Sequence, residues 1–498
     1  MGMFEQLITG FHAVIQPINL LLCFVGVFIG TLIGVLPGLG RSGTMAILFP
    51  ITFGLPPVSA IILLAGIYYG AQYGGSTTAI LVNIPGETSS VMTCLDGYQM
   101  ARQGRAGPAL GISALGSFIG GSITLLALMF IATPLARAAL KFGPADYFAL
   151  MCMGLVLVIY LARGSISKAI IMALVGLFLG TVGIELASGT PRFTFKLLTL
   201  SDGIGMVPLI MGIFGIAEVL TNLEGPLERV IFKTQIKNLL PNLEDWKRST
   251  GPIIRASIIG FFLGLLPGGG AILPTFVSYT IEKKLSKHPE EFGRGAIEGV
   301  AGPETANNAG AGGSLVPLFA LGLPPNPSLA ILLGALMVHG VAPGPKFIIE
   351  HGDIFWGVIA SMYMGNVMLL ILNLPLIGLW VKVLKVPYWI LMPLIIIFCV
   401  IGCYSLNSSK WDLFIMTIFG IVGYLLRKFG YEEAVLVLAF ILGPMLELNF
   451  RQALIVSDGR LTAFLERPFS AAALAISALL LISSGFSYYR RSKSRSLQ

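Results

Sequence analysis

Two stretches of the chain place hydroxyl and amide side chains beside glycines in otherwise apolar surroundings. They are residues 74–87 and residues 302–314. Hydroxyl and amide groups can bind a carboxylate or coordinate a cation without the cost of burying a charge. The same groups also form hydrogen bonds between helices, but their clustering at two places favours a binding site. The candidate site residues are Gly75, Ser76, Thr77, Asn83, Pro85, Glu304, Asn307, Asn308, Gly313 and Ser314.

Acidic residues in the same stretches could couple the movement of a solute to that of an ion. Glu87 ends the first stretch, and Glu304 lies near the start of the second. Each carboxylate could carry a proton or hold a cation within the membrane, or could simply lie at the membrane surface. Ser76, Asn307 and Asn308 could supply oxygen ligands for Na⁺. The expected coupling ion is therefore Na⁺ or H⁺.

Two apolar runs stop abruptly at a proline followed by glycines. Residues 30–40 read GTLIGVLPGLG, and residues 260–270 read GFFLGLLPGGG. Proline removes a backbone donor and glycine lets the chain leave the helix, and in hydrocarbon the freed groups must be satisfied by protein or by a water-filled cavity. Exposed N–H groups at the start of a half-helix attract anions, and unwound carbonyls can hold Na⁺. The predicted site residues here are Pro37, Gly38, Gly40, Arg41, Gly268, Gly269 and Gly270.

Arg41 is the least ordinary of these residues. Its guanidinium could pair with an anionic substrate, or it could snorkel to the membrane surface. The second copy has Ala271 at the corresponding position. This asymmetry suggests that the first break is the one that meets the anion.

The two breaks lie 230 positions apart (267 minus 37), and a second echo follows them in the same order. A Gly-Gly-Ser sequence at residues 74–76 precedes Pro85, and another at residues 312–314 precedes Pro324. Because the proline-glycine breaks and the Gly-Gly-Ser sequences recur in the same order, they predict an internal repeat. If the first repeat begins outside the membrane and the second begins inside, the repeats are inverted and their breaks face each other at mid-membrane.

The composition indicates an integral membrane protein. The 498 residues are 55% hydrophobic and 11% charged, whereas a soluble domain carries roughly 25% charged residues. We predict an all-α polytopic membrane protein with about 10–12 transmembrane helices and additional broken or re-entrant half-helices in two inverted repeats. The expected divisions are residues 1–221 as the first repeat, 222–252 as a cytoplasmic linker, 253–470 as the second repeat, and 471–498 as a last transmembrane helix with a basic cytoplasmic tail.

The distribution of charge predicts the orientation. The net charge of +8 would suggest nucleic acid in a soluble protein, but here the positive residues lie in loops between spans, as the positive-inside bias explains. The basic tail places the C-terminus in the cytoplasm. Arg451, Arg460 and Arg467 then fall outside, against the bias. We expect no nucleic-acid partner.

Enzymatic chemistry is not expected. The five cysteines are scattered without metal-ligand spacing, and the chain has no Walker A motif. Residues 40–43 resemble the G-x-S-G of intramembrane serine proteases, but that chemistry needs a histidine base beside Ser42. His339 is the intramembrane candidate, and nothing in the sequence brings it there. We therefore expect no catalytic residue, no metal and no cofactor.

Four long motifs resemble one transporter family. Residues 64–87 (LAGIYYGAQYGGSTTAILVNIPGE), 96–112, 286–318 and 332–345 are similar to the large membrane subunit of tripartite tricarboxylate transporters. The resemblance implies a secondary transporter of the bacterial inner (plasma) membrane that takes up tricarboxylates or related carboxylates by Na⁺ or H⁺ symport. It also implies two protein partners, a small four-helix membrane subunit and a periplasmic solute-binding protein. The alternative is a stand-alone carboxylate or anion permease, or a channel, that needs no binding protein.

The chain departs from the family pattern at two predicted site loops. Pro325 stands where the family usually has a glycine, and Arg41 stands where a small or polar residue is commoner. The resemblance therefore implies a carboxylate more securely than it implies a tricarboxylate.

Overall fold

The computed structural model describes residues 3–36, 40–162, 165–185, 189–224, 239–266, 271–383 and 388–495. Within these residues the chain is almost entirely helical, and its strands are two residues each, β1 (Gly183–Ile184) and β2 (Pro191–Arg192). Six helical stretches are long and apolar enough to cross a membrane: α2 (Pro17–Val35), α6 (Ala106–Ala139), α7 (Pro144–Leu161), Met206–Glu224, α16 (Gly352–Asn373) and α20 (Glu433–Val456). The predicted all-α polytopic membrane protein is thereby confirmed, whereas the inversion of its repeats stays a prediction.

Shorter and less regular helices complete the described chain. Four of the shorter apolar pieces are α8 (Ile166–Leu179), α14 (Pro327–Val338) and parts of α18 (Tyr388–Asn407) and α22 (Pro468–Arg495). The Met206–Glu224 stretch consists of α9 (Met206–Ile210), the π-helix η4 (Met211–Ile216) and α10 (Ala217–Glu224). Further elements are α1 (Met3–Ile15), η1 (Phe49–Gly54), η2 (Thr88–Ser90), η3 (Leu198–Leu200), η5 (Pro289–Glu291), α15 (Phe347–Glu350), α17 (Ile377–Val383), α19 (Lys410–Lys428) and α21 (Ala463–Glu466).

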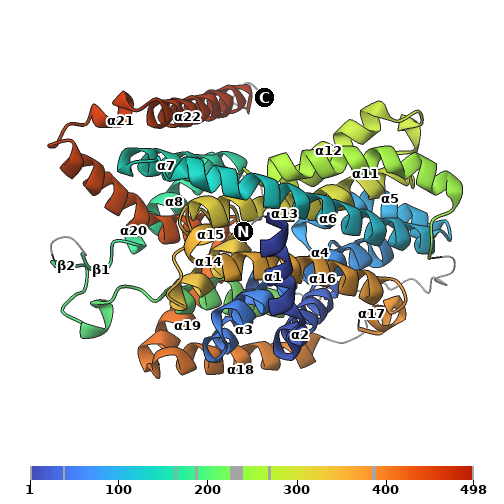
Figure 1. The fold of residues 1–498 in the computed structure, drawn as a ribbon, viewed down its shortest axis with the longest axis horizontal. Coiled ribbons are helices and arrows are strands. Elements are labelled where there is room, and N and C mark those ends of the chain that lie inside the picture. The colour runs from blue at the N-terminus through green and yellow to red at the C-terminus, as the bar shows by residue number, and fades with distance from the viewer. Residues whose placement is uncertain are drawn as a thin grey trace.

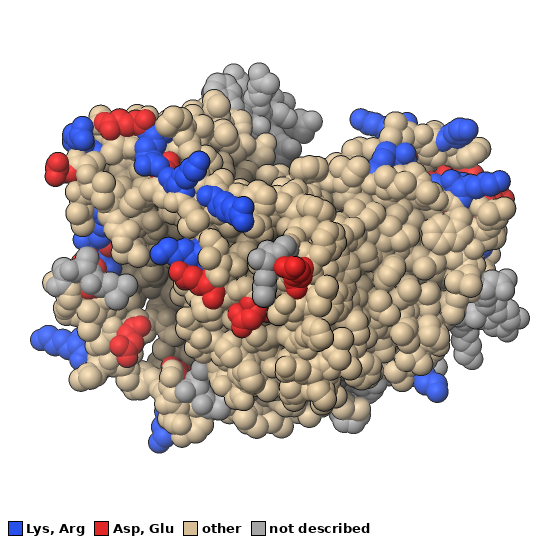
Figure 2. All heavy atoms as spheres, viewed as in Figure 1, with Lys and Arg blue, Asp and Glu red and all other residues tan. Residues whose placement is uncertain are grey.

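The surface has the charge distribution of a membrane protein. In Figure 1, α6, α7 and α22 run roughly along the long axis of the molecule. Figure 2 shows charged side chains over the left half of this face and at its right end, with a band to the right of the middle that has none. A band of this kind suits the hydrocarbon core of a bilayer, because charged side chains there are costly.

Two helices form the centre of the molecule. Nearly every residue of α4 (Pro57–Val82) and of α13 (Glu298–Leu321) is buried. A helix that has no solvent-facing side packs against neighbours all round. The polar residues that the sequence singles out at 74–78 and 304–314 lie on these two helices, so they are enclosed by protein.

Small residues allow α2 to pack closely on α4. A Cβ atom added at Gly34 would lie well under 3.0 Å from the carbonyl oxygen of Ala71, and one added at Gly74 would meet the carbonyl oxygen of Thr31 equally closely. Glycine is required here because the two backbones touch.

The same contact recurs between α11 (Leu243–Gly264) and α13. A Cβ atom at Gly264 would collide with the carbonyl oxygen of Gly310, and one at Gly313 with that of Phe261. These residues lie 230 positions after those of α2 (264 minus 34) and 239 after those of α4 (313 minus 74). The helix pair is therefore built twice, which gives the repeat a structural counterpart.

Short helices from the two halves pack against each other. A half-helix lies in the chain between the two members of each close pair: α3 (Arg41–Leu48) comes between α2 and α4, and α12 (Ile272–Leu285) comes between α11 and α13. α3 contacts α14 of the other half, and α12 contacts α5 (Val91–Arg102). Each short helix thus contacts a helix of the opposite half. The interval predicted as a linker includes the start of α11, which begins at Leu243.

Candidate functional site

Arg41 begins α3 and is enclosed by protein. The residue is 8% exposed, so the guanidinium does not snorkel to a surface. Its backbone N–H donates to Oε1 of Glu87 at 2.9 Å, and its Nε lies 3.7 Å from Oε2 of the same carboxylate. The guanidinium carbon lies 4.9 Å from the ring centroid of Tyr68, within the range of a cation–π interaction. Arg41 and Glu87 therefore form a buried, loosely spaced ion pair.

Gln72 connects Arg41 to the second half of the chain. With its carboxamide oxygen facing Arg41, that oxygen accepts from Nη1 at 3.0 Å. The amide nitrogen then donates to Asn307, both to the side-chain Oδ1 and to the backbone oxygen at 3.2 Å. The sequence did not single out Gln72, although a lone amide in the apolar run before the first Gly-Gly-Ser is a signal that could have identified it.

The first residues of α3 and α14 meet beside Arg41. Ser42 Oγ and Ser328 Oγ are 2.8 Å apart, and Nδ2 of Asn326 donates to the hydroxyl of Tyr68 at 3.3 Å. Asn326 also caps α14, because its Oδ1 accepts from the backbone N–H of Leu329 at 3.0 Å. Helix N-termini carry partial positive charge. Two N-termini and a guanidinium at one place favour an anion.

Glu304 lies at the centre of a second polar group. It is fully buried, and its two carboxylate oxygens accept from Ser76 Oγ of α4 and from Thr93 Oγ1 of α5. No ion pair to Glu304 occurs among the residues that the structure describes. Thr93 was not a sequence candidate, because it follows the first polar stretch and only the turn of the chain after α4 returns it to Glu304.

Asn308 belongs to the same region. Its Nδ2 donates to Ser117 Oγ of α6 at 2.7 Å and to the backbone oxygen of Glu304 at 3.2 Å. Its Oδ1 is buried without a hydrogen-bond partner in the described structure. The predicted trio of Ser76, Asn307 and Asn308 is thus divided, since Asn307 contacts Gln72 while Ser76 contacts Glu304.

The other sequence candidates have packing or chain-turn roles, although Ser314 also hydrogen-bonds to Tyr68 and Gly75 packs against Glu87. Ser314 donates to the backbone oxygens of Gly264 and Gly310 at 3.0 and 2.8 Å, so its hydroxyl serves the contact of α11 with α13. Asn83 is an exposed left-handed residue (φ 58°) that ends α4, and Pro85 follows in the turn after it. Gly40 (φ 55°) precedes α3. Gly75 and Thr77 are buried and Gly313 is a packing glycine, whereas Pro37, Gly38, Gly268, Gly269 and Gly270 lie outside the described residues.

Asp96, one turn after Thr93 on α5, holds this helix to its neighbours. Asp96 is fully buried, and its Oδ1 accepts three backbone N–H groups, from Gly293, Gly295 and Ala296, at 2.8, 2.9 and 3.0 Å. Its Oδ2 accepts from the hydroxyl of Tyr279 at 2.9 Å. A single carboxylate therefore holds α5, α12 and the turn before α13 together.

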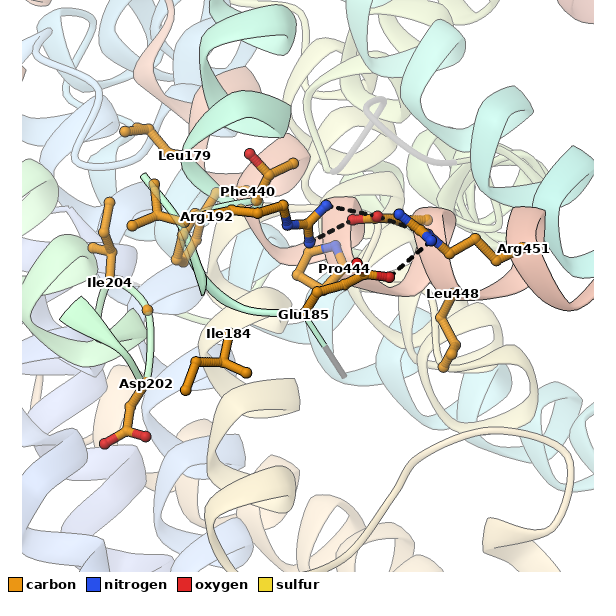
Figure 3. A pocket seen from close by; sticks show the side chains of 15 residues that line it. Leu179, Ile184, Glu185, Arg192, Asp202, Ile204, Phe440, Pro444, Leu448 and Arg451 are labelled. Carbon is orange, nitrogen blue, oxygen red and sulfur yellow. Dashed lines mark hydrogen bonds and ion pairs between the residues drawn. The ribbon is translucent and has the colours of Figure 1, made fainter. Parts of the chain in front are cut away.

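Two cavities lie near the ends of the short helices and of α20. One, of about 470 Å³, is bordered by Phe53 at the end of η1, by His339 at the end of α14, and by Asn407. It lies at the far end of α14 and at the end of η1, which follows α3 in the chain. The other, of about 280 Å³, lies between the β1–β2 hairpin and α20 (Figure 3).

Charged residues hold the hairpin to α20 at the second cavity. Figure 3 shows the side chains of Arg192, from the hairpin, and Arg451, from α20, pointing toward each other. Arg192 binds both oxygens of Glu447, at 2.8 and 3.1 Å, and this carboxylate raises the pKa of Arg192. Arg451 lies 2.8 Å from Glu185 and 2.9 Å from Glu447. The cations at this cavity are therefore already compensated.

Arg460 and Arg467, which the sequence also places outside against the positive-inside bias, form ion pairs as well. Arg467 lies 2.5 Å from Asp146, and Arg460 lies 3.8 Å from Glu466. Their carboxylate partners reduce the free positive charge at this end of the molecule.

Ser42 and His339, the serine and histidine that a protease site would have to bring together, lie at opposite ends of α14. Ser42 contacts Ser328 at the start of this helix, whereas His339 caps its other end.

Comparison with known proteins decides the family. The model of the family described as "Tripartite tricarboxylate transporter TctA family" matches residues 20–438. The chain belongs to this TctA family. It is 52% identical over 476 residues, covering 96% of this chain and 95% of the relative, to a protein of Agrobacterium vitis described as "Uncharacterized 52.8 kDa protein in TAR-I ttuC' 3'region".

A second Agrobacterium vitis relative supports the same assignment. It is described as "Uncharacterized protein in TAR-II ttuC' 3'region", and it is 52% identical over 223 residues, 45% of this chain and 92% of the relative. No solved structure matches the chain. TctA family membership and the apolar helices together make this chain a multi-pass membrane subunit of a tripartite transporter.

Proposed function

We propose that this TctA-family chain is the large permease subunit of a binding-protein-dependent secondary transporter that takes up tricarboxylates or related carboxylates by Na⁺ or H⁺ symport. The observation that carries the proposal is the position of Arg41. A buried guanidinium stands at the converging N-termini of α3 and α14, and the nearest carboxylate oxygen to its Nε is 3.7 Å away.

The chemistry of the guanidinium suits a carboxylate substrate. Arginine offers five N–H donors in a planar fork that matches a carboxylate with two parallel hydrogen bonds. Gln72 takes one donor at 3.0 Å, and the 3.7 Å separation from Glu87 is beyond hydrogen-bonding distance. Donor groups of Arg41 therefore remain for an incoming anion, and burial strengthens their attraction because the local dielectric is low.

The short helices supply a route and a means of alternating access. The cavity of about 470 Å³ at the far ends of η1 and α14 is the proposed entrance on the periplasmic side. In transporters with inverted repeats, the substrate site lies at mid-membrane and one bundle rocks against the other. α3 contacts α14 and α12 contacts α5, and in this proposal one of these pairs serves each side of the membrane.

The family supplies the expected assembly. In this proposal the chain works in the bacterial inner membrane with a small four-helix membrane subunit, and a periplasmic solute-binding protein delivers the carboxylate. The C-terminus then lies in the cytoplasm. Glu87 serves as the counter-ion of Arg41 until the substrate carboxylate replaces it.

Uptake into vesicles tests the proposal. The chain is reconstituted with and without its membrane partner and binding protein, and labelled di- and tricarboxylates are offered under a Na⁺ gradient, a pH gradient or neither. We expect accumulation above the outside concentration only with the partners and a cation gradient. A passive channel would instead equilibrate the label without a gradient, and accumulation without the binding protein would contradict the tripartite assembly.

A further inference from the structure

We propose that Glu304, Ser76 and Thr93 form the binding site of the co-transported monovalent cation. This assignment rests on the proposed function, because it names the place where the driving ion binds. It separates the cation site at Glu304 from the anion site at Arg41, and it includes Thr93 of α5 among the groups that bind the cation.

Charge compensation is the first argument. Glu304 is 0% exposed, and no Lys, Arg or His makes an ion pair with it in the described part of the chain. An isolated ionised carboxylate in an apolar interior is costly, so it requires either a proton or a cation. Arg41 is already opposed by Glu87. A mobile cation is therefore the missing partner of Glu304.

The neighbouring groups suit such a cation. The hydroxyls of Ser76 and Thr93 contact the carboxylate from α4 and α5, and Ser113 on α6 also hydrogen-bonds to it. A hydroxyl can donate to a carboxylate, accept from a protonated carboxyl group, or turn its oxygen toward a metal cation. The carboxylate of Glu304 and these hydroxyls can therefore accommodate either a proton on Glu304 or Na⁺ beside it, with no change in the backbone.

Among the residues that the structure describes, no charged side chain competes with a cation at Glu304. The titratable side chains on which the charge of Glu304 acts are Tyr73 of α4 and Cys94 of α5, both neutral at physiological pH. On the α12 side, Glu282 pairs with Arg255. The hydroxyl of Tyr73 is buried without a hydrogen-bond partner in the described structure, so a further oxygen is available close to Glu304.

The cation site is physically connected to the anion site. Asn307 follows Glu304 by three residues on α13, and it contacts Gln72, whose oxygen accepts from Arg41. With Glu304 ionised, the buried charges of Arg41, Glu87 and Glu304 sum to −1, and a carboxylate substrate would make the excess larger. Binding of a cation brings the sum to zero. The cation therefore favours substrate binding, and the substrate favours cation binding by the same factor.

Charge-neutral and shape-matched variants test the assignment in the reconstituted complex. Glu304→Gln mimics the neutral carboxyl group, so it should abolish gradient-driven accumulation while labelled substrate still exchanges across the membrane. Thr93→Val should raise the half-saturating concentration of the cation by about 10-fold, as expected when one hydrogen bond to a charged group is lost, and Thr93→Ser should restore it. Thr31→Val is the matched control, because the Thr31 hydroxyl donates to Val27 of its own helix.

The outcomes distinguish Na⁺ from H⁺ as the coupling ion. They also distinguish failure of the Glu304 site from failure of the proposed function. A wild-type dependence on Na⁺ that is lost in E304Q identifies Na⁺, and a dependence on pH alone that is lost in E304Q identifies H⁺; either result supports the site. Accumulation by E304Q with unchanged dependence on Na⁺ and pH, or an equal effect of T93V and T31V, overturns it. Failure of the wild type to accumulate any carboxylate under either gradient contradicts the proposed function itself, and this site with it.

Discussion

The carboxamide of Gln72 lies between Arg41 and Asn307 and hydrogen-bonds to both. This contact joins the first half of the chain to the second where each half contributes a polar side chain to the buried centre of the molecule. Because Asn307 lies one turn from Glu304, Gln72 stands between the proposed anion and cation sites.

The first prediction concerns this bridge. Gln72→Leu keeps the size of the side chain but removes both hydrogen bonds, so we expect the KM for substrate to rise about 10-fold and to lose most of its dependence on cation concentration. Initial uptake rates at low and high cation concentration measure both effects. Gln103→Leu is the control, because Gln103 is exposed. A KM in Q72L that follows the cation as in the wild type would show that the bridge does not couple the sites.

The second prediction separates the charge of Arg41 from its shape. Arg41→Lys keeps a positive charge but loses the planar fork, so we expect the KM for carboxylates to rise by about 10- to 100-fold while the variant still folds. The reason is that an ammonium group cannot make two parallel hydrogen bonds to one carboxylate. Substrate titration of uptake, with protein quantity matched by gel filtration of the solubilised complex, gives the measurement. An unchanged KM would assign Arg41 a structural role in pairing with Glu87.

The third prediction tests the close helix pairs. Gly74→Ala and Gly313→Ala each place a methyl group against a backbone carbonyl, of Thr31 and Phe261 respectively. Overpacking of this kind costs about 1–3 kcal/mol, so both variants should unfold at lower temperature in detergent. Gly54→Ala is the control, since a Cβ atom at Gly54 meets nothing within 4 Å. Equal unfolding temperatures for all three would contradict the packing.

The fourth prediction concerns the anchor at Asp96. Asp96→Ala leaves three backbone N–H groups and the Tyr279 hydroxyl without their acceptor. We expect the turn at residues 286–297 to loosen, and limited trypsin digestion should cleave at Lys287 or Arg294 several times faster than in the wild type. Asp96→Asn keeps one acceptor oxygen and should lie between the two. If D96A resists trypsin like the wild type, the anchor does not hold this turn.

The sequence predicted those features that depend on local chemistry. Gly34 and Gly264 lie 230 positions apart (264 minus 34), near the ends of α2 and α11, and each precedes a proline by three residues, so the spacing alone predicts the repeat. Arg41 and Glu304 stand out because charge within apolar sequence is rare. The helical membrane fold follows from composition in the same way.

The contacts that join distant segments could not be predicted. Ser42 meets Ser328 across 286 positions, and Thr93 meets Glu304 across 211. Such pairs are set by how α3 packs on α14 and how α5 returns toward α13, and no local pattern encodes them. Ser314 shows the converse, because its sequence surroundings match those of Ser76 while its hydroxyl bonds to the backbone of α11 and α13.

The most direct test of the account is uptake by Arg41→Gln in reconstituted vesicles, with the partners and the cation gradient present. The account predicts that R41Q loses accumulation of labelled carboxylate while Arg460→Gln, whose arginine is exposed, accumulates it as the wild type does. Both variants should elute from gel filtration like the wild type. Accumulation by R41Q with a normal KM would contradict the account, because the anion would then bind elsewhere.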